Sequence, residues 1–327
     1  MASTTSKVRV RIGAAAVAVL CGAALTAIAA PGSAASAAGT RDTVGVRVIE
    51  QNINYSLNAK TLPNLEAQFR AENPDVVMIV EICRSGVQQF ESAFPSWHAH
   101  YTPNRKVQSG CAKASGGVSY PYSKGELLAS PHSITNVTRY GLADSPHDPS
   151  RQFHLTCGDV MLGAAGTQGL RACATHLRNG RNAPWKYAER TKQASQIAKI
   201  LKPRIDGGQP VVLSGDFNAK PFEAPLDSLY GLDAKGQYTS SGGQFDESQQ
   251  SDKDYWKDDP SCTSHYHCRS GQPTIREPNQ PVNPQGRYDD IFYSRANTSD
   301  LHGYRLPYNG SDHYPISSTA KVSLATS

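Results

Sequence analysis

The sequence predicts an α+β fold in which β-sheets stack face to face and helices cover them. Short β-branched runs recur along the chain, bounded by Gly, Pro, Asn or Ser, whereas helical patterns are few. After the first forty residues, no internal repeat and no long low-complexity linker divides the chain. The strand-like runs are 44–52, 76–80, 127–129, 153–162, 170–176, 211–214, 288–293 and 316–322.

Two stretches carry a helical pattern. Residues 62–72 form the first, and Pro74 ends it because the residue before a proline is disfavoured in helical geometry. The second covers residues 185–201, where Ile197 and Leu201 recur at the spacing of one buried helix face. Two helices among eight strands fit helices that cover sheets rather than a helical bundle.

A polar segment lies between two of the strands. Residues from about 230 to 286 are rich in Gly, Pro and Asp and show little hydrophobic periodicity. A structureless stretch of this length inside a compact domain is uncommon, and we interpret it as a long surface insert. The prediction is therefore one domain over residues 39–327, with no second domain.

The first 38 residues have the pattern of a cleaved signal peptide. A basic start leads into the apolar, Ala-rich stretch 12–30, and small residues follow at 33–38. A membrane anchor is the alternative, but the Ala-X-Ala pattern and the missing basic stop favour cleavage. We therefore expect a secreted, extracellular and monomeric protein without a stable membrane anchor.

Removal of this segment also changes the charge of the chain. The formal net charge is +5, and three of the positive charges lie in the first 38 residues. The mature chain therefore carries about +2, which only weakly favours binding to a polyanion. Any attraction for such a partner must come from local basic patches.

Six cysteines remain after the signal segment. An even number in an exported chain favours disulfides, and six cysteines allow 15 sets of pairings. Pairing of neighbours in sequence predicts Cys83–Cys111, Cys157–Cys173 and Cys262–Cys268. For the last pair a metal knuckle with the intervening histidines is the alternative, which export makes less favourable.

Acidic and amide side chains stand at the ends of predicted strands. Asp216 and Asn218 follow the apolar run 211–214, and such a pair can hold hydrated Mg²⁺ and position a water. Glu81 ends the run 76–80, and Asn52 closes the first strand. Each of these also fits a simple turn or a solvated strand end, since Asp, Asn and Gly are turn formers.

Two histidines complete this set. His176 ends an apolar strand and is followed by Arg178, which suits a phosphate site. His313 follows Asp312 just before the last strand. Asp289 alternates with apolar residues, so we expect it to point inward and orient His313, with Asp290 facing outward.

In their order along the chain, these motifs resemble the endonuclease/exonuclease/phosphatase superfamily, which includes deoxyribonuclease I and sphingomyelinases. The resemblance runs from about Val44 to Val322, nearly the whole of the expected domain. The matching motifs are Gln51-Asn52-Ile53, Pro74-Asp75-Val76 through Glu81, Thr175-His176-Leu177, Gly215-Asp216-Phe217-Asn218, Tyr288-Asp289-Asp290-Ile291 and Ser311-Asp312-His313.

The resemblance implies a four-layer α/β/β/α sandwich of two mainly antiparallel sheets flanked by helices, with the site at one end. It implies that Glu81, with Asn52 and Asp312, holds Mg²⁺, for which Mn²⁺ can substitute. The implied catalytic residues are His176, Asp216, Asn218, Asp289 and His313. Which histidine is base and which is acid stays open.

Three features favour a deoxyribonuclease I-like enzyme, with DNA as the expected substrate. They are His176, the version of the motif around Asp289, and Arg151, which opens a strand where those nucleases place a phosphate contact. Arg178 is a second candidate phosphate contact. Cys83 departs from the pattern, since those nucleases carry an Arg there.

The alternatives are a secreted lipid phosphodiesterase of the sphingomyelinase type and, less favoured, a phosphomonoesterase. Both would use the same catalytic set. A non-catalytic binding module does not fit, because no metal or imidazole residue of the motifs is missing.

Overall fold

The structure, a computed structural model, describes residues 41–55, 58–107, 110–143, 147, 152–163, 169–180, 183–231, 243–250, 269, 271–276 and 286–325. The predicted signal peptide, residues 1–38, lies outside this part of the chain. Gly39–Ser327 form one compact unit. No helix within the described ranges is long and apolar enough to cross a bilayer.

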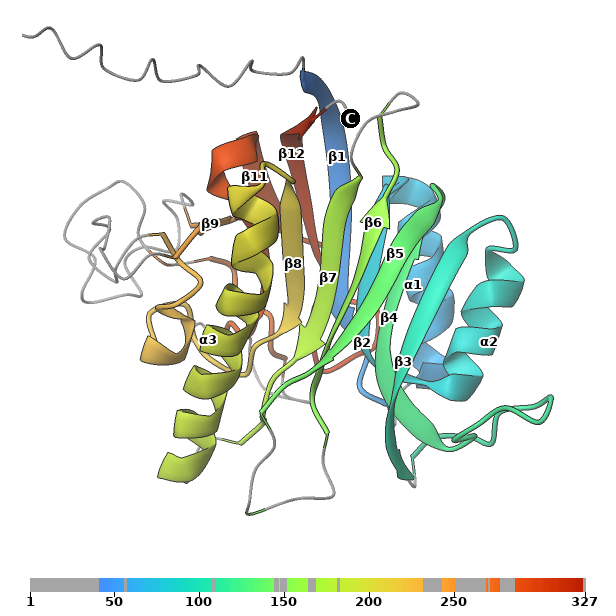
Figure 1. Cartoon of the computed structure of the whole chain (residues 1–327). Coiled ribbons are helices and arrows are strands. Elements are labelled where there is room, and N and C mark those ends of the chain that lie inside the picture. Colours follow the sequence, from blue (N-terminus) through green and yellow to red (C-terminus); the bar gives the residue numbers. More distant parts are fainter. Residues whose placement is uncertain are drawn as a thin grey trace, which may run out of the picture. The chain divides into compact units, whose positions relative to one another are not determined.

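Two six-stranded sheets form the centre of this unit (Figure 1). Neighbouring strands are antiparallel except in two pairs, β1 with β2 and β7 with β8. The first sheet has the order β11 (Thr298–Arg305), β12 (Ile316–Ala325), β1 (Arg41–Asn52), β2 (Val76–Cys83), β4 (Ser123–Ser130), β3 (His98–Val107). The second has the order β5 (Ile134–Gly141), β6 (His154–Val160), β7 (Leu170–His176), β8 (Val211–Asp216), β10 (Asp289–Ser294), β9 (Phe245–Glu247).

Helices cover the outer faces of both sheets (Figure 1). The first sheet carries α1 (Asn58–Glu72) and α2 (Arg84–Ala93), and the second carries α3 (Pro184–Asp206). Among the described residues, Ala224–Leu226 and Arg295–Asn297 form short 3-10 helices. This architecture confirms the predicted four-layer α/β/β/α sandwich of two mainly antiparallel sheets.

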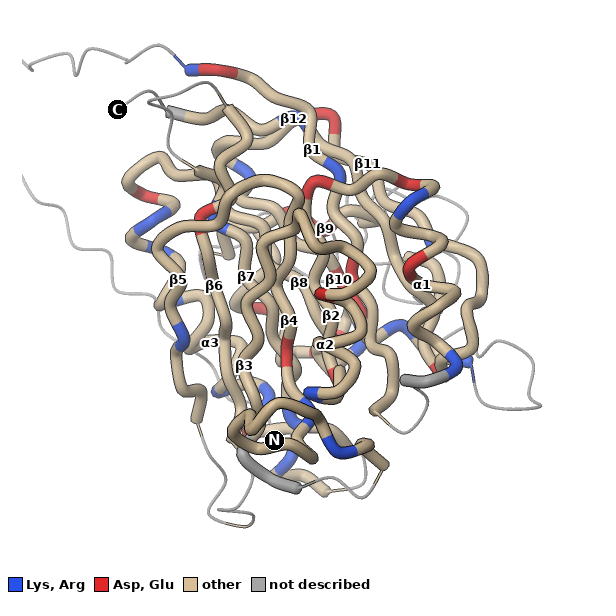
Figure 2. Tube along the Cα trace, turned by 90° about the vertical axis from the view of Figure 1, so that its right-hand side faces the viewer, with Lys and Arg blue, Asp and Glu red and all other residues tan. Residues whose placement is uncertain are grey.

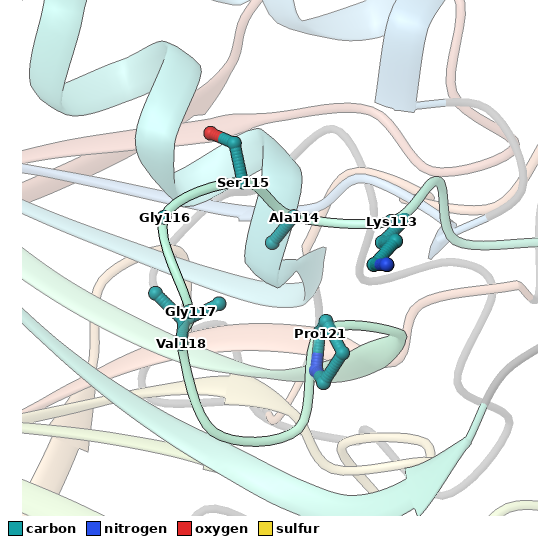
Figure 3. A pocket seen from close by; sticks show the side chains of 7 residues that line it. All are labelled: Lys113, Ala114, Ser115, Gly116, Gly117, Val118 and Pro121. Atoms are coloured by element: carbon teal, nitrogen blue, oxygen red, sulfur yellow. The ribbon is translucent and has the colours of Figure 1, made fainter.

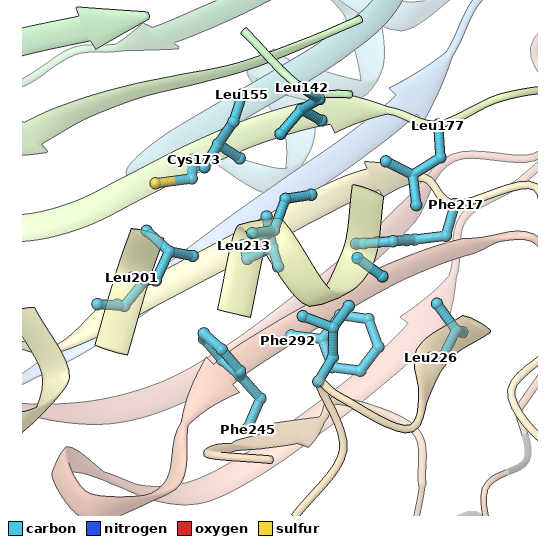
Figure 4. Packing of buried hydrophobic residues seen from close by; sticks show 14 of the residues in the cluster. Leu142, Leu155, Cys173, Leu177, Leu201, Leu213, Phe217, Leu226, Phe245 and Phe292 are labelled. Atoms are coloured by element: carbon cyan, nitrogen blue, oxygen red, sulfur yellow. The ribbon is translucent and has the colours of Figure 1, made fainter. Parts of the chain in front are cut away.

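Three apolar cores separate the four layers. The middle core lies between the sheets and includes Val48, Val212 and Ile291, which alternate with outward-facing residues on their strands. A second core packs α1 and α2 on the first sheet. The third lies under α3, where Phe217 and Phe292 meet edge to face with ring centroids 5.1 Å apart (Figure 4).

The segment that we predicted as a surface insert, residues about 230–286, is partly inside the fold. Tyr230 and Phe245 are buried in the core under α3, and β9 pairs with β10 as the edge of the second sheet. The interpretation as a surface excursion was therefore wrong for this part. Apolar residues in the segment are too sparse to show a period, although Tyr230 and Phe245 fill core positions.

Two of the predicted disulfides lie within the described residues. Cys83 is bonded to Cys111, and Cys157 to Cys173. Cys157 and Cys173 are directly opposed on the antiparallel pair β6–β7, which brings their Cα atoms within 4.1 Å. The third predicted pair, Cys262–Cys268, lies outside the described residues and stays a prediction.

Reduction of these bonds should lower the thermal stability of the protein. A native disulfide contributes about 3 kcal/mol in the chain-entropy account, because it restricts the unfolded chain. We expect the melting temperature to fall by roughly 5–10 °C in reductant. Differential scanning fluorimetry measures this, and the double variant Cys83→Ser/Cys111→Ser should respond less to reductant than the native chain. A melt that reductant leaves unchanged would contradict the prediction.

Candidate active site

The topology brings the predicted site residues to one end of the sandwich. The parallel pairs β1–β2 and β7–β8 end on the same side, the lower end in Figure 1. Asn52 and Glu81 lie there on the first sheet, and His176 and Asp216 are register partners on the second. Asp289, at the start of β10, pairs with Asp216 across the antiparallel ladder.

A short contact joins His313 to Asp289 in this cluster. The Nδ1 atom of His313 lies 2.7 Å from Oδ2 of Asp289, and its Nε2 atom lies 4.0 Å from Oδ2 of Asp216. Burial opposes the charge of His313, but Asp289 outweighs it and raises the pKa of His313 to about 10. Asp289 therefore holds a protonated ring whose Nε2 faces Asp216, and the geometry agrees with the expected inward direction of Asp289.

Asp290 does not face solvent, contrary to our expectation. It is fully buried, and its carboxylate accepts a hydrogen bond from Nε of Arg287 at 2.7 Å. Arg287 also contacts Glu247 on β9 at 2.6 Å, so the outer side of β10 is covered by the segment predicted to be a surface insert. The alternating directions of Asp289 and Asp290 along β10 were predicted correctly. The burial of the outer face of β10 by the segment that includes β9 was not predicted.

His176 links the two sheets at this end. Its Nε2 atom lies 3.6 Å from Oδ2 of Asp216, and its Nδ1 atom lies 3.7 Å from Oε1 of Glu81. Burial raises the pKa of Asp216 to about 7, and the nearby charge of Asp289 acts in the same direction. A carboxylate with such a pKa can take up or release a proton near neutral pH, as a general base requires.

Glu81 is aimed into the site by a break in its strand. The pairing of β2 with β4 shifts between Ile79 and Ile82, and Glu81 between them has φ 58°. A bulge of this kind re-aims a side chain, and positive φ at a residue other than Gly is often found at functional sites. Burial opposes the charge of Glu81, but Lys124 and His176 outweigh it and lower the pKa of Glu81 to about 2.

Asn52 and Asp312 also lie at this end of the sandwich, where side-chain amides contact the carboxylates. The side-chain amide of Asn52 donates to Oδ2 of Asp216 at 2.9 Å, and that of Asn54 donates to Oδ2 of Asp312 at 3.0 Å. Ser311 Oγ donates to the backbone oxygen of Asn52 at 2.8 Å, which ties the loop before β12 to the end of β1. Asn54 was not among the predicted site residues, although its position two residues after Asn52 was the available signal.

Backbone geometry holds Asn218 beside Asp216. Gly215 has φ 145°, and a Cβ atom there would lie 1.8 Å from the carbonyl oxygen of Thr175, so only glycine fits. Asn218, with φ 51°, donates its backbone N–H to Oδ1 of Asp216 at 2.8 Å. This contact orients the Asp216 carboxylate toward the two histidines.

The two predicted phosphate-binding arginines are not part of this cluster as described. Arg151 lies outside the described residues. Arg178 is buried, its Nε atom donates to Glu189 on α3 at 3.0 Å, and its guanidinium lies over the rings of Phe153 and Trp185. Its charge is therefore used within the fold, and the geometry gives no support to a phosphate contact by Arg178.

The chemistry of the donor set fits a divalent cation. Asp216, Asp289 and His313 offer ligand atoms that all lie within 4.8 Å of one another. Carboxylate and amide oxygens are the ligands that Mg²⁺ prefers. Oδ1 of Asp289 is buried and has no hydrogen-bond partner among the described residues, which leaves it available to a donor or a cation. The compact donor group differs from the predicted set of Asn52, Glu81 and Asp312, whose role stays a prediction.

A buried acid behind the site should make stability depend on pH. Burial raises the pKa of Glu126 on β4 to about 8, while Arg139 and Lys124 oppose the shift and Glu81 adds to it. The stability that this group contributes is complete below about pH 4.5 and is lost as the pH rises toward 8, because the unfolded chain ionises first.

Glu126→Gln should therefore raise the free energy of unfolding by about 3 kcal/mol at pH 8 and leave it nearly unchanged at pH 4. Urea unfolding at the two pH values measures the difference. A variant that is equally stabilised at both pH values would contradict the titration of Glu126 as the cause.

A hollow of about 440 Å³ is lined by none of the residues of this cluster (Figure 3). Its lining consists of Lys113, Ala114, Ser115, Gly116, Gly117, Val118 and Pro121, from the loop between β3 and β4. The Cys83–Cys111 bond ties this loop to the end of β2, two residues beyond Glu81. Tyr120 and Tyr122 on the same loop are exposed.

The chain matches the profile of the Endonuclease/Exonuclease/phosphatase family over residues 51–313. The chain belongs to this family. The match begins at Gln51 and ends at His313, and so spans every described residue of the cluster. Family members are hydrolases of phosphate esters that typically use divalent metals, and this class of reaction therefore applies to the chain.

Solved structures of the family share the fold at low sequence identity. The catalytic domain of human Nocturnin with a bound sulfate has a TM-score of 0.61 at 16% identity, over 86% of this chain and 96% of that domain. An endonuclease/exonuclease/phosphatase from Beutenbergia cavernae has 0.60 at 16%, over 85% and 72%. TDP2 of D. rerio, complexed with a single-strand DNA product, has 0.55 at 16%, over 84% and 98%. No curated protein sequence matches significantly.

Proposed function

We propose that the chain is a secreted, Mg²⁺-dependent phosphodiesterase that hydrolyses DNA as a deoxyribonuclease I-like endonuclease. The observation that carries this proposal is the continuous chain of contacts Asp289–His313–Asp216–His176–Glu81 at the end of the sandwich. It combines a protonated imidazole, a carboxylate that titrates near neutral pH and an ionised glutamate in one buried cluster.

Each residue supports a separate part of phosphodiester hydrolysis. Asp216 accepts the proton of the attacking water, since its pKa of about 7 suits a general base. His313, held by Asp289, donates through Nε2 to a phosphate oxygen and stabilises the charge that develops there. His176, buried between the two carboxylates, assists the leaving oxygen.

The metal ion would be held by Glu81 with Asn52 and Asp312, because the protonated ring of His313 has no lone pair to offer a metal. When bound, a divalent cation stabilises the negative charge of the phosphoryl group as a Lewis acid. The low pKa of Glu81 keeps this ligand ionised at every physiological pH. The oxygen ligands of this set suit Mg²⁺, and Mn²⁺ can substitute because it accepts the same ligands.

The surface around the cluster supports a nucleic-acid substrate. Several Lys and Arg positions gather at the lower end in Figure 2, which carries the β3–β4 loop. Exposed Tyr120 and Tyr122 lie on that loop with Lys113, and aromatic rings beside basic groups are a common way to bind nucleic-acid strands. The exposed large apolar side chains among the described residues are mostly tyrosines, and these form no apolar patch suited to entry into a lipid surface.

A parallel assay tests this function. The mature chain, from residue 39, is incubated with supercoiled plasmid, single-stranded DNA, RNA and sphingomyelin vesicles, each with Mg²⁺ or with EDTA. We expect nicking of the plasmid with Mg²⁺, none in EDTA, and recovery on addition of Mg²⁺ or Mn²⁺. Full activity in EDTA would refute the metal mechanism, and preferred cleavage of sphingomyelin would replace DNA by a lipid substrate.

A further inference from the structure

Lys124 lies where a cation would be expected on the Glu81 carboxylate. Its Nζ atom is 2.6 Å from Oε1 of Glu81, and their side chains are only 7% and 12% exposed. The ring of Tyr55 lies under the ammonium group, with its centroid 4.5 Å away. Lys124 is therefore a buried ion-pair partner of the residue proposed to bind the metal, and solvent screens this pair little.

The pairing of β2 with β4 fixes the position of Lys124, unlike that of a lysine in a flexible surface ion pair. Lys124 is the register partner of Cys83, next to the bulge that turns Glu81 inward. The Cys83–Cys111 bond closes the loop that leads to Lys124. The two neighbouring strands and the disulfide therefore hold the ammonium group of Lys124 next to Glu81.

We propose that Lys124 is an intrinsic counter-ion of the metal site, an inference that rests on the proposed metal-dependent function. Its ammonium group competes with the divalent cation for Glu81 and moves away when the cation binds. Two cations on one buried carboxylate repel each other strongly, because the low dielectric of the site weakens screening. Displacement of the ammonium must therefore precede or accompany metal binding. Lys124 lowers metal affinity, and it keeps Glu81 paired and in place when no metal is bound.

The displaced ammonium also couples metal binding to the substrate. A lysine side chain has a flexible stem of four carbons, so the released ammonium stays at the edge of the same site. A phosphate group that arrives there supplies a new anionic partner for it. By reciprocity of coupling between ligands, phosphate should tighten metal binding in the native chain, and more so than in a variant without this charge.

Calorimetric titration of Mn²⁺ into the metal-stripped mature chain tests the proposal. Lys124→Met removes the competing charge, and we expect at least about tenfold tighter Mn²⁺ binding. Lys124→Arg keeps the charge and should stay within about threefold of the native chain. Lys202→Met is the matched control, because Lys202 also pairs with a carboxylate, Asp206, but on the exposed side of α3.

Repetition of the titrations with inorganic phosphate measures the coupling, which Lys124→Met should reduce. Unchanged or weaker Mn²⁺ binding by Lys124→Met overturns the proposal, and so does an equal gain in Lys124→Arg. If Lys124→Met does not fold, Lys124→Gln, which retains a hydrogen-bond donor for Glu81, carries the same expectation. A chain that shows the tighter binding but cleaves no phosphodiester would refute the proposed function and leave the role of Lys124 standing.

Discussion

Substitution of His313 by alanine is expected to lower kcat by at least about a hundredfold, the usual scale for an acid–base group in its transition state. The ring is the protonated member of the cluster, held by Asp289 at 2.7 Å, whereas His176, which also lies near Asp216, makes its other contact with Glu81. Since the group acts on charge that develops during reaction, KM should change much less than kcat. Steady-state kinetics on the substrate that the parallel assay identifies measures both constants.

The control must separate lost chemistry from lost structure. His313→Ala leaves the buried Asp289 carboxylate without its partner, which can itself cost several kcal/mol of stability. His313→Asn keeps a donor for Asp289 but has no ring to carry a proton, so it should fold and still lose activity. His302→Ala, on the exposed edge strand β11, should retain native kcat. A tenfold loss or less in His313→Asn would remove His313 from the catalytic role.

Most strands of the inner sheets were predictable because their two faces are both buried. The runs that include Val76–Cys83 and Val211–Leu213 are almost continuously apolar, and this signal needs no knowledge of neighbours. The edge strands Ile134–Gly141 and Thr298–Arg305 were missed. Their residues are largely exposed, so the apolar period that marks a strand is weak.

The helix α2 was missed for a different reason. It begins at Arg84 directly after β2, and Cys83 at its N-cap makes no side-chain capping bond. A start signal of the kind provided by Ser, Thr or Asp is absent, and only Val87 and Phe90 mark the buried face. Packing of Phe90 against Phe69 and Phe94, which are distant from the start of the helix, stabilises the helix.

At the site, residues at strand ends were predictable and their long-range partners were not. Asn52, Glu81, His176 and Asp216 each follow an apolar run, so the topology alone brings them together. Lys124 is 43 residues from Glu81 in sequence, and nothing local to Lys124 distinguishes it from a solvated lysine. The ion pair of Arg178 with Glu189 on α3 was likewise not predictable from the residues around Arg178, and its phosphate contact stays a prediction.

Asp216→Asn should lower the activity of the protein but raise its stability near neutral pH. Asparagine retains the size of the side chain and an oxygen that accepts from Asn52, but it takes up no proton from a water. We therefore expect kcat to fall by at least about a hundredfold. Burial raises the pKa of Asp216 above that of the unfolded chain, so its contribution to stability is lost as the pH rises from about 4 to about 7.

Because asparagine is neutral at every pH, the variant should melt at a higher temperature than the native chain at pH 7.5 and at the same temperature at pH 4. The melts are recorded in EDTA, so that no divalent cation compensates the charge of Asp216. Asp300→Asn, an exposed carboxylate on β11 that pairs with Lys321, should change neither kcat nor the pH dependence of the melt. Loss of activity together with loss of stability at pH 7.5 would assign Asp216 a structural role, whereas retained activity would exclude it as the base.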